Sequence, residues 1–149
     1  MIISKELGRE HRNEIKALFK AVFMNAPWND DWSDEAQLDS YLDELTGEKS
    51  SLTVGLFEDG ELIGLSMGCI RHWWQGTEYY IFEFCIRADK QGSGRGTAFL
   101  EDVIRIAKEK GVTHIFLQTE HSAPAYGFYR KNGFEELEGH VSLVKFFEK

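Results

Sequence analysis

Two features that could do chemistry lie close together in the middle of the sequence. Glu83 is the one carboxylate in an apolar run, YYIFEFCI (79–86), and a glycine-rich stretch, QGSGRG (91–96), follows shortly after it. Burial of a lone carboxylate raises its pKa toward neutrality and makes it a better proton acceptor. Because successive side chains of a strand point to opposite faces, however, Glu83 could instead face solvent. Bare backbone N–H groups where a helix begins form a site for an anion such as a diphosphate, and Lys90 and Arg95 could add charge there.

Other uses of the glycine-rich stretch can be weighed on its spacing. A P-loop needs a lysine followed by Ser or Thr after its last glycine, but Gly96 is followed directly by Thr97. A dinucleotide fingerprint, GxGxxG, needs a third glycine where Thr97 stands, and the strands before it look antiparallel. A tight turn whose glycines supply positive φ remains open. That alternative must still explain why glycine recurs at alternate positions leading into a helix.

Gln91, Gly94 and Gly96 fit the pattern Q/R-x-x-G-x-G/A. In this pattern the sequence resembles the GNAT superfamily of N-acetyltransferases. A second segment, SAPAYGFYRKNGF (122–134), is similar to the family's N-x-x-A-x-x-x-Y-x-x-x-G-F, with Ser122 where the family often has Asn. Because the order of predicted elements also matches, the resemblance covers nearly the whole chain.

The resemblance implies acetyl-CoA as a co-substrate and no metal. The family pattern binds the diphosphate of the coenzyme, so the expected coenzyme contacts here are Gln91, Gly92, Ser93, Gly94, Arg95, Gly96, Thr97 and Ser122. In the family, the strands that correspond to 79–86 and 112–119 splay apart. The backbone of Cys85 and Ile86 would then pair with the pantetheine arm, as an added strand pairs with a sheet edge. An N–H there would stabilise a developing oxyanion.

Direct acetyl transfer to an amine needs two proton movements. Many family members carry a glutamate facing the acceptor at the position of Glu83, which we therefore expect to be the general base, directly or through a water. Tyr129 matches the family tyrosine that protonates the coenzyme sulfur. Packing of its ring in the core is the alternative.

In resembling enzymes the two N-terminal helices and their connecting loop, here NAPWNDDWS (25–33), cover the acceptor. Trp28, Asp31 and Trp32, together with Glu83, are the expected substrate contacts, because aromatic rings and carboxylates bind cationic amines. The acceptor would then be a primary amine on a cationic small molecule, such as an aminoglycoside or a polyamine. Alternatively, the acidic residues could form a solvated helix face, and the loop tryptophans could cover the core as a lid. A protein or peptide N-acetyltransferase and a non-catalytic acyl-CoA sensor are the competing functions.

The elements that must position these residues follow from hydropathy periods and turn signals. They are a strand at 1–7, helices at 9–23 and from an N-cap at Ser33 to about Leu45, strands at 51–58, 61–74 and 77–86, a helix ending at Gly111, a strand at 112–119, a helix at 124–132 and a closing hairpin at 134–149. This order, βααβββαβαββ, predicts an α+β, GNAT-like three-layer fold, with a mixed, mostly antiparallel sheet flanked by helices. We expect a single N-acetyltransferase domain over residues 1–149.

Composition limits the partners. A formal net charge of −8 argues against nucleic acid, and there is no apolar stretch of about 18 residues, which a membrane span requires. Cys69 and Cys85 lie in apolar runs without metal-ligand spacing, and the histidines show none either. We expect a cytoplasmic enzyme that acts on a small-molecule amine, and the resemblance also allows a homodimer.

Overall fold

A single five-stranded sheet organises the computed structural model, which describes residues 1–148. Its strands are β1 (Ile2–Glu6), β2 (Ser51–Glu58), β3 (Glu61–Trp73), β4 (Gly76–Ile86) and β5 (His114–Leu117), and they lie in that order across the sheet. Neighbouring strands are antiparallel except β4 and β5, which are parallel. Tight turns join β2, β3 and β4, whereas a parallel pair needs a long crossover, which the helix α3 (Arg95–Glu109) supplies.

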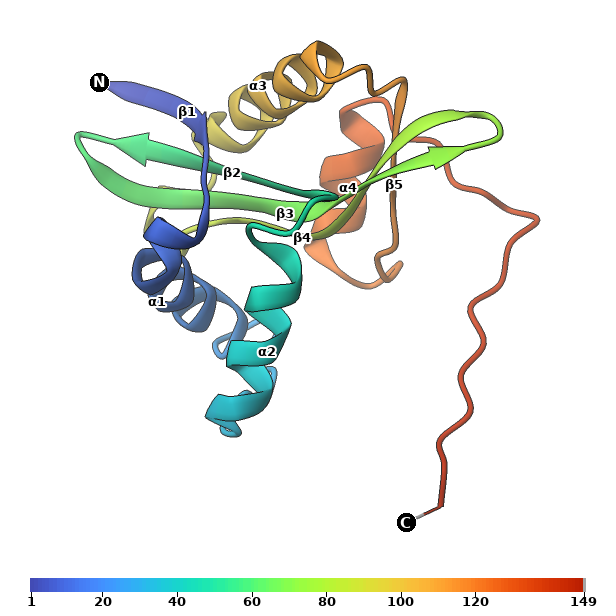
Figure 1. Ribbon diagram of the computed structural model, residues 1–149, viewed down its shortest axis with the longest axis horizontal. Helices are drawn as coiled ribbons and strands as arrows, with labels where there is room; N and C mark the ends of the chain where they lie inside the picture. The colour runs from blue at the N-terminus through green and yellow to red at the C-terminus, as the bar shows by residue number, and fades with distance from the viewer. Residues whose placement is uncertain (149) are drawn as a thin grey trace. The chain divides into compact units, whose positions relative to one another are not determined.

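The helices of this part of the chain cover both faces of the sheet. Figure 1 shows α1 (Arg12–Phe23) and α2 (Glu35–Leu45) on one face and α3 on the other. Together with the sheet they form one compact unit, Met1–Gln118. The three-layer α+β fold predicted from the sequence is confirmed.

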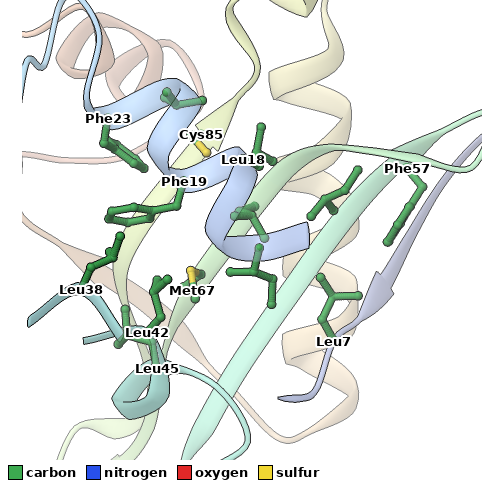
Figure 2. Packing of buried hydrophobic residues seen from close by; sticks show 14 residues of the cluster. Leu7, Leu18, Phe19, Phe23, Leu38, Leu42, Leu45, Phe57, Met67 and Cys85 are labelled. Atoms are coloured by element: carbon green, nitrogen blue, oxygen red, sulfur yellow. The ribbon is translucent and has the colours of Figure 1, made fainter. Parts of the chain in front are cut away.

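Two hydrophobic clusters fill the spaces between these layers. One lies between the sheet and the helices α1 and α2, where Phe19, Leu38, Leu42 and Met67 converge (Figure 2). The other lies between the sheet and α3, and its side chains include Leu52, Val54, Ile81, Phe99 and Val103. Alternate residues of a strand point to opposite faces, so β2 and β3, which are covered on both sides, have nearly continuous apolar sequences.

A β-bulge in β4 decides which side chains face α1 and α2. Met67 pairs with Glu83 but Gly68 pairs with Ile81, so Phe82 is an extra residue on β4. Before the bulge, Ile81 belongs to the cluster under α3; after it, Cys85 belongs to the cluster under α1 and α2. Without the extra residue, Ile81 and Cys85 would face the same side of the sheet, because side chains of a regular strand alternate between its two faces. The bulge therefore turns the Glu83 side of the strand toward the N-terminal helices.

The start of α2 differs by one residue from the prediction. Asp34, rather than Ser33, is the N-cap residue, and its carboxylate accepts a 3.1 Å hydrogen bond from the N–H of Gln37. The Ser33 N–H instead donates to the side chain of Asp31, 3.0 Å away. Asp and Ser are comparable N-caps, so the local turn at Asp31 decides between them.

The second compact unit begins at Thr119 and contains α4 (Pro124–Lys131). After the C-cap residue Asn132 comes Gly133, whose φ of +90° allows the N–H of Phe134 to donate to the carbonyl of Tyr129 at 3.0 Å. The Phe134 and Tyr129 rings pack with centroids 5.2 Å apart. This is a Schellman C-cap with its usual hydrophobic contact, so the Gly-Phe pair of the second motif has a structural role in ending the helix.

The closing hairpin predicted for 134–149 is not found. Residues 134–148 contain no strand, and Lys149 lies outside the described residues. The apolar side chains that suggested strands there are exposed, among them Leu137, Val141, Leu143, Phe146 and Phe147. A two-stranded hairpin is marginal unless its apolar face is packed, which explains how the pattern and the structure differ.

Candidate active site

Glu83 is partly buried on β4 and faces α2. The hydroxyl of Tyr41 donates a 2.7 Å hydrogen bond to Glu83 Oε1. Burial raises the pKa of Glu83 to about 7; the Tyr41 hydrogen bond opposes this rise and the nearby Asp30 carboxylate adds to it. A carboxylate with a pKa near neutrality can accept a proton at physiological pH with useful driving force, as a general base must.

Aromatic rings from α1, α2 and the loop between them surround Tyr41. Trp32 stacks on Tyr41 with ring centroids 5.3 Å apart and planes 15° apart, and Phe19 meets the edge of Trp32 at 5.5 Å. Trp28 packs instead on Phe23, at 5.9 Å. The predicted contact residue Trp32 is thus linked to Glu83 through Tyr41, while Trp28 rests at the end of α1.

Asp30 and Asp31 are both exposed, but different contacts act on their carboxylates. The hydrogen bond from Ser33 lowers the pKa of Asp31. Asp30 is held by its own N–H, which donates to the carbonyl of Phe23 at 2.8 Å. Desolvation by its neighbours raises the pKa of Asp30, and an interaction with the Trp32 indole opposes this rise. That interaction is loose, because Trp32 Nε1 is one of the buried polar atoms without a hydrogen-bond partner within residues 1–148.

The acidic face of α2 is neutralised by α1. Lys16 lies 2.6 Å from Glu35 and 2.8 Å from Asp39, and Arg12 lies 3.0 Å from Asp43. These ion pairs hold the two helices together, so most of the acidic residues in this stretch are not available to a cationic ligand. Asp30 is the carboxylate of the loop that acts electrostatically on Glu83.

The pairing between β4 and β5 ends before β4 does. The last parallel pair is Ile81 with Leu117, while β4 continues to Ile86. This is the arrangement that the predicted splay requires. Cys85 is buried there, and burial raises the pKa of its thiol to about 12. A thiol with so high a pKa stays protonated and is a poor nucleophile, so the Cys85 side chain is a packing group.

The glycine-rich stretch leads into α3 as a turn with positive φ. Gly92 and Gly94 have φ of +79° and +81°, and a Cβ added at either would meet no atom within 4 Å. The side chain of Gln91 donates to the carbonyl of Ile86 at 2.8 Å and so ties the turn to the end of β4. Gly94 caps α3 without a side-chain hydrogen bond, and there is no acidic residue in the first turn. The first N–H groups of a helix, here those of Arg95, Gly96 and Thr97, have no intrahelical acceptors.

Two cations flank this turn and share one carboxylate. Glu58, at the end of β2, lies 2.6 Å from Lys90 Nζ and 2.8 Å from Arg95 Nη2. Hydrogen bonds from Lys90 and then Arg95 lower the pKa of Glu58 to about 2. Arg95 also donates to the hydroxyl of Ser93. Glu58 therefore fixes both cations beside the turn, and one net positive charge remains.

Two predicted residues lie in the second unit. Tyr129 is buried, and its ring packs against those of Phe128 and Phe134. Ser122 is exposed in the turn before α4. The Tyr129 ring therefore packs within the second unit, and its role as a proton donor stays a prediction.

The structure thus combines a three-layer fold, a bulged β4, a glycine turn at the start of α3 and a glutamate with a pKa near neutrality. The sequence model of the acetyltransferase (GNAT) family matches residues 12–134. The chain belongs to this family and is an acyl-CoA-dependent N-acetyltransferase. No curated protein sequence matches the chain significantly.

Proteins whose solved structures have the same fold are named for different acceptors. An aminoglycoside acetyltransferase from an uncultured soil metagenomic sample is 18% identical, with a TM-score of 0.74 and coverage of 100% of this chain and 99% of that chain. The aminoglycoside N-acetyltransferase AAC(6')-Iy in complex with CoA is 19% identical, with a TM-score of 0.72 and coverage of 100% and 95%. A ribosomal-protein-alanine N-acetyltransferase from Brucella melitensis biovar Abortus 2308 is 15% identical, with a TM-score of 0.75 and coverage of 99% of each chain.

Residues 1–148 contain neither a cluster of metal-ligating side chains nor a membrane-spanning helix. No three His, Cys, Asp or Glu side chains gather where they could hold a metal ion. None of the helices in this part of the chain is long and apolar enough to cross a membrane.

Sequence reasoning missed two side chains of the site, Tyr41 and Glu58. Tyr41 lies 42 residues from Glu83 in the chain, so only the packing of α2 on the sheet brings them together. Asp30 stands with Asp31 between the two loop tryptophans, where the sequence suggests charge for a cationic amine. No local pattern marks Glu58, whose partners Lys90 and Arg95 follow two strands later, after β3 and β4.

Proposed function

We propose that the protein transfers the acetyl group of acetyl-CoA to a primary amine of a cationic small molecule. The observation that carries this proposal is the environment of Glu83, a partly buried carboxylate with a pKa of about 7 beside Tyr41 and Asp30. In this proposal Glu83 removes the proton from the attacking ammonium, and Tyr129 supplies one to the departing sulfur. A protein that only senses acyl-CoA has no need of such a base.

The residues present suit the diphosphate of the coenzyme. The open space over Gly92 and Gly94 leaves room for phosphate oxygens, and the uncapped start of α3 offers N–H donors to them. Lys90 and Arg95 add charge at the same place, and Ser93, Thr97 and Ser122 are further proposed contacts. The backbone of Cys85 and Ile86, where β4 extends past β5, would take the pantetheine arm. When bound, the coenzyme supplies the activated acetyl group.

The loop between α1 and α2, together with Tyr41 and Glu83, supports the proposed acceptor class. Trp28, Trp32 and Tyr41 offer aromatic surface, and Asp30 and Glu83 offer negative charge that is not paired with a lysine or arginine within the described chain. Aromatic faces and carboxylates together favour a cation. The aminoglycoside acetyltransferases with this fold support a small polycationic acceptor, whereas the ribosomal-protein-alanine N-acetyltransferase has the same fold and is named for a protein acceptor.

A thiol-release assay with acetyl-CoA tests the proposal across a panel of acceptors. The panel contains an aminoglycoside, spermidine, a peptide with an N-terminal alanine, and a control without amine. We expect saturable thiol release with at least one of the two polycations and none with the peptide.

Each other outcome selects a different function. Turnover of the peptide alone would make the protein a peptide N-acetyltransferase. Heat of acetyl-CoA binding in calorimetry, with no thiol released by any amine, would make it a sensor. The same panel run with longer acyl donors reports the chain-length preference.

A further inference from the structure

We propose that Tyr41 is a positioning residue that holds the Glu83 carboxylate in the orientation needed to accept a proton from the acceptor ammonium. This inference rests on the proposed function, because it assigns a role in the same site. It concerns a side chain from a helix that carries none of the family's motif residues.

The contact between the two side chains is specific. Tyr41 Oη lies 2.7 Å from Glu83 Oε1, and within residues 1–148 it is the one hydrogen-bond partner of this carboxylate. A single donor on one oxygen restricts the orientation of the carboxylate and leaves lone pairs of the other oxygen for a second donor. An ammonium group is such a donor.

Tyr41 is itself held on more than one side. Its ring stacks on Trp32 at 5.3 Å and meets the edge of Phe19 at 6.1 Å. Leu38 and Leu42, on the same helix, are completely buried in the cluster between α2 and the sheet. A phenol clamped in this way has lost its rotamer freedom before any ligand binds, so it can orient Glu83 without a further entropy cost.

Few groups near Glu83 influence its proton affinity. Tyr41 faces it from α2, Asp30 faces it from the loop after α1, and the neutral thiol of Cys85 follows it on β4. The cations of α1, Arg12, Lys16 and Lys20, are paired with the acids of α2. Burial and Asp30 raise the pKa of Glu83, whereas the Tyr41 hydroxyl lowers it by donating to the ionised form.

These opposing effects predict the result of removing one oxygen atom. In Tyr41→Phe the ring stays stacked, but the carboxylate loses its donor, so its pKa should rise by roughly one unit. Glu83 acts as a base when ionised, so activity that appears as pH rises through its pKa should appear at a higher pH in the variant. The loss of orientation should also lower kcat at the alkaline plateau roughly tenfold, with the KM for acetyl-CoA unchanged.

The first measurement needs no acceptor. A ¹³C carboxyl titration of the glutamate-labelled protein, with Glu83 assigned by its absence in Glu83→Gln, gives its pKa in wild type and in Tyr41→Phe. A matched control is Tyr80→Phe. Tyr80 lies on the same strand as Glu83, and its hydroxyl donates to Gln118 at 3.1 Å. We expect a higher Glu83 pKa in Tyr41→Phe and no change in Tyr80→Phe.

Kinetics with the acceptor found in the panel then separate the two proposals. If Glu83→Gln is inactive while Tyr41→Phe keeps the wild-type pH profile, kcat and titration, the positioning role is wrong and the proposed base stands. If Glu83→Gln keeps wild-type activity, Glu83 is not the base and both fail. A Tyr41→Phe protein that loses thermal stability but shows an unmoved titration would have only a packing role at this position.

Discussion

The Cα of Gly68 in β3 lies against the backbone of Tyr80 in β4, so that an added Cβ would stand 1.9 Å from the Tyr80 carbonyl oxygen. This close approach occurs where Phe82 is the extra residue of the β4 bulge. The bulge turns the strand so that Glu83 can meet α2. One glycine therefore supports the position of the proposed base from the neighbouring strand.

Gly68→Ala should destabilise the protein because the clash is with backbone that cannot rotate away. We expect a loss of about 1–3 kcal/mol in the free energy of unfolding, measured by urea titration. The control is Gly127→Ala on α4, where a Cβ meets no atom within 4 Å. That change should stabilise or leave stability within about 1 kcal/mol, because alanine is the better helix former. Equal stability of both variants with wild type would mean that the strands do not approach so closely.

Gly94→Ala tests the coenzyme turn with a control of matched conformation. Gly94 and Gly111 have φ of +81° and +86°, and both face open space. An alanine in this region costs roughly 1–2 kcal/mol, so both variants should lose similar stability. Only Gly94→Ala should raise the KM for acetyl-CoA, because Gly111 follows the opposite end of α3. A rise in KM in both variants, or in neither, would remove the turn at Gly94 from the coenzyme site.

Asp30→Asn and Asp31→Asn separate the two neighbouring carboxylates. Asp30 raises the pKa of Glu83, so removing its charge should lower that pKa and move the acid limb of activity to lower pH, opposite to Tyr41→Phe. The KM of a cationic acceptor should rise roughly two- to fivefold. Asparagine at Asp31 still accepts from Ser33, so that variant should behave as wild type. The reverse result, with Asp31 controlling the acceptor KM, would contradict the placement of the acceptor beside Asp30.

Most helices and strands of the three layers could be predicted, because a local sequence pattern indicates each of them. The stripe of Ile15, Leu18, Phe19 and Val22 predicts the buried face of α1, and the alternate glycines predict the positive φ angles at Gly92 and Gly94. The lone carboxylate in an apolar strand pointed to Glu83. Each of these signals lies within a few residues of the feature it predicts.

The parts that were missed depend on contacts between distant segments. The hydrogen bond of Tyr41 to Glu83 requires the packing of α2 on the sheet, and Tyr41 looks like an ordinary member of the helix's apolar face. The pairing of Glu35 and Asp39 with Lys16 likewise requires α1 and α2 to pack side by side, which no local pattern indicates. The pattern at 134–149 predicted a closing hairpin, yet residues 134–148 contain no strand.

The pH dependence of kcat in wild type and Glu83→Gln, measured with the amine acceptor from the panel, tests the central claim most directly. Wild-type activity should rise through a pKa of about 7, as Glu83 ionises. In Glu83→Gln that limb should vanish and kcat should fall by roughly 100- to 10,000-fold, with the KM for acetyl-CoA retained. A variant that keeps both the wild-type kcat and the same limb would contradict the assignment of Glu83 as the base.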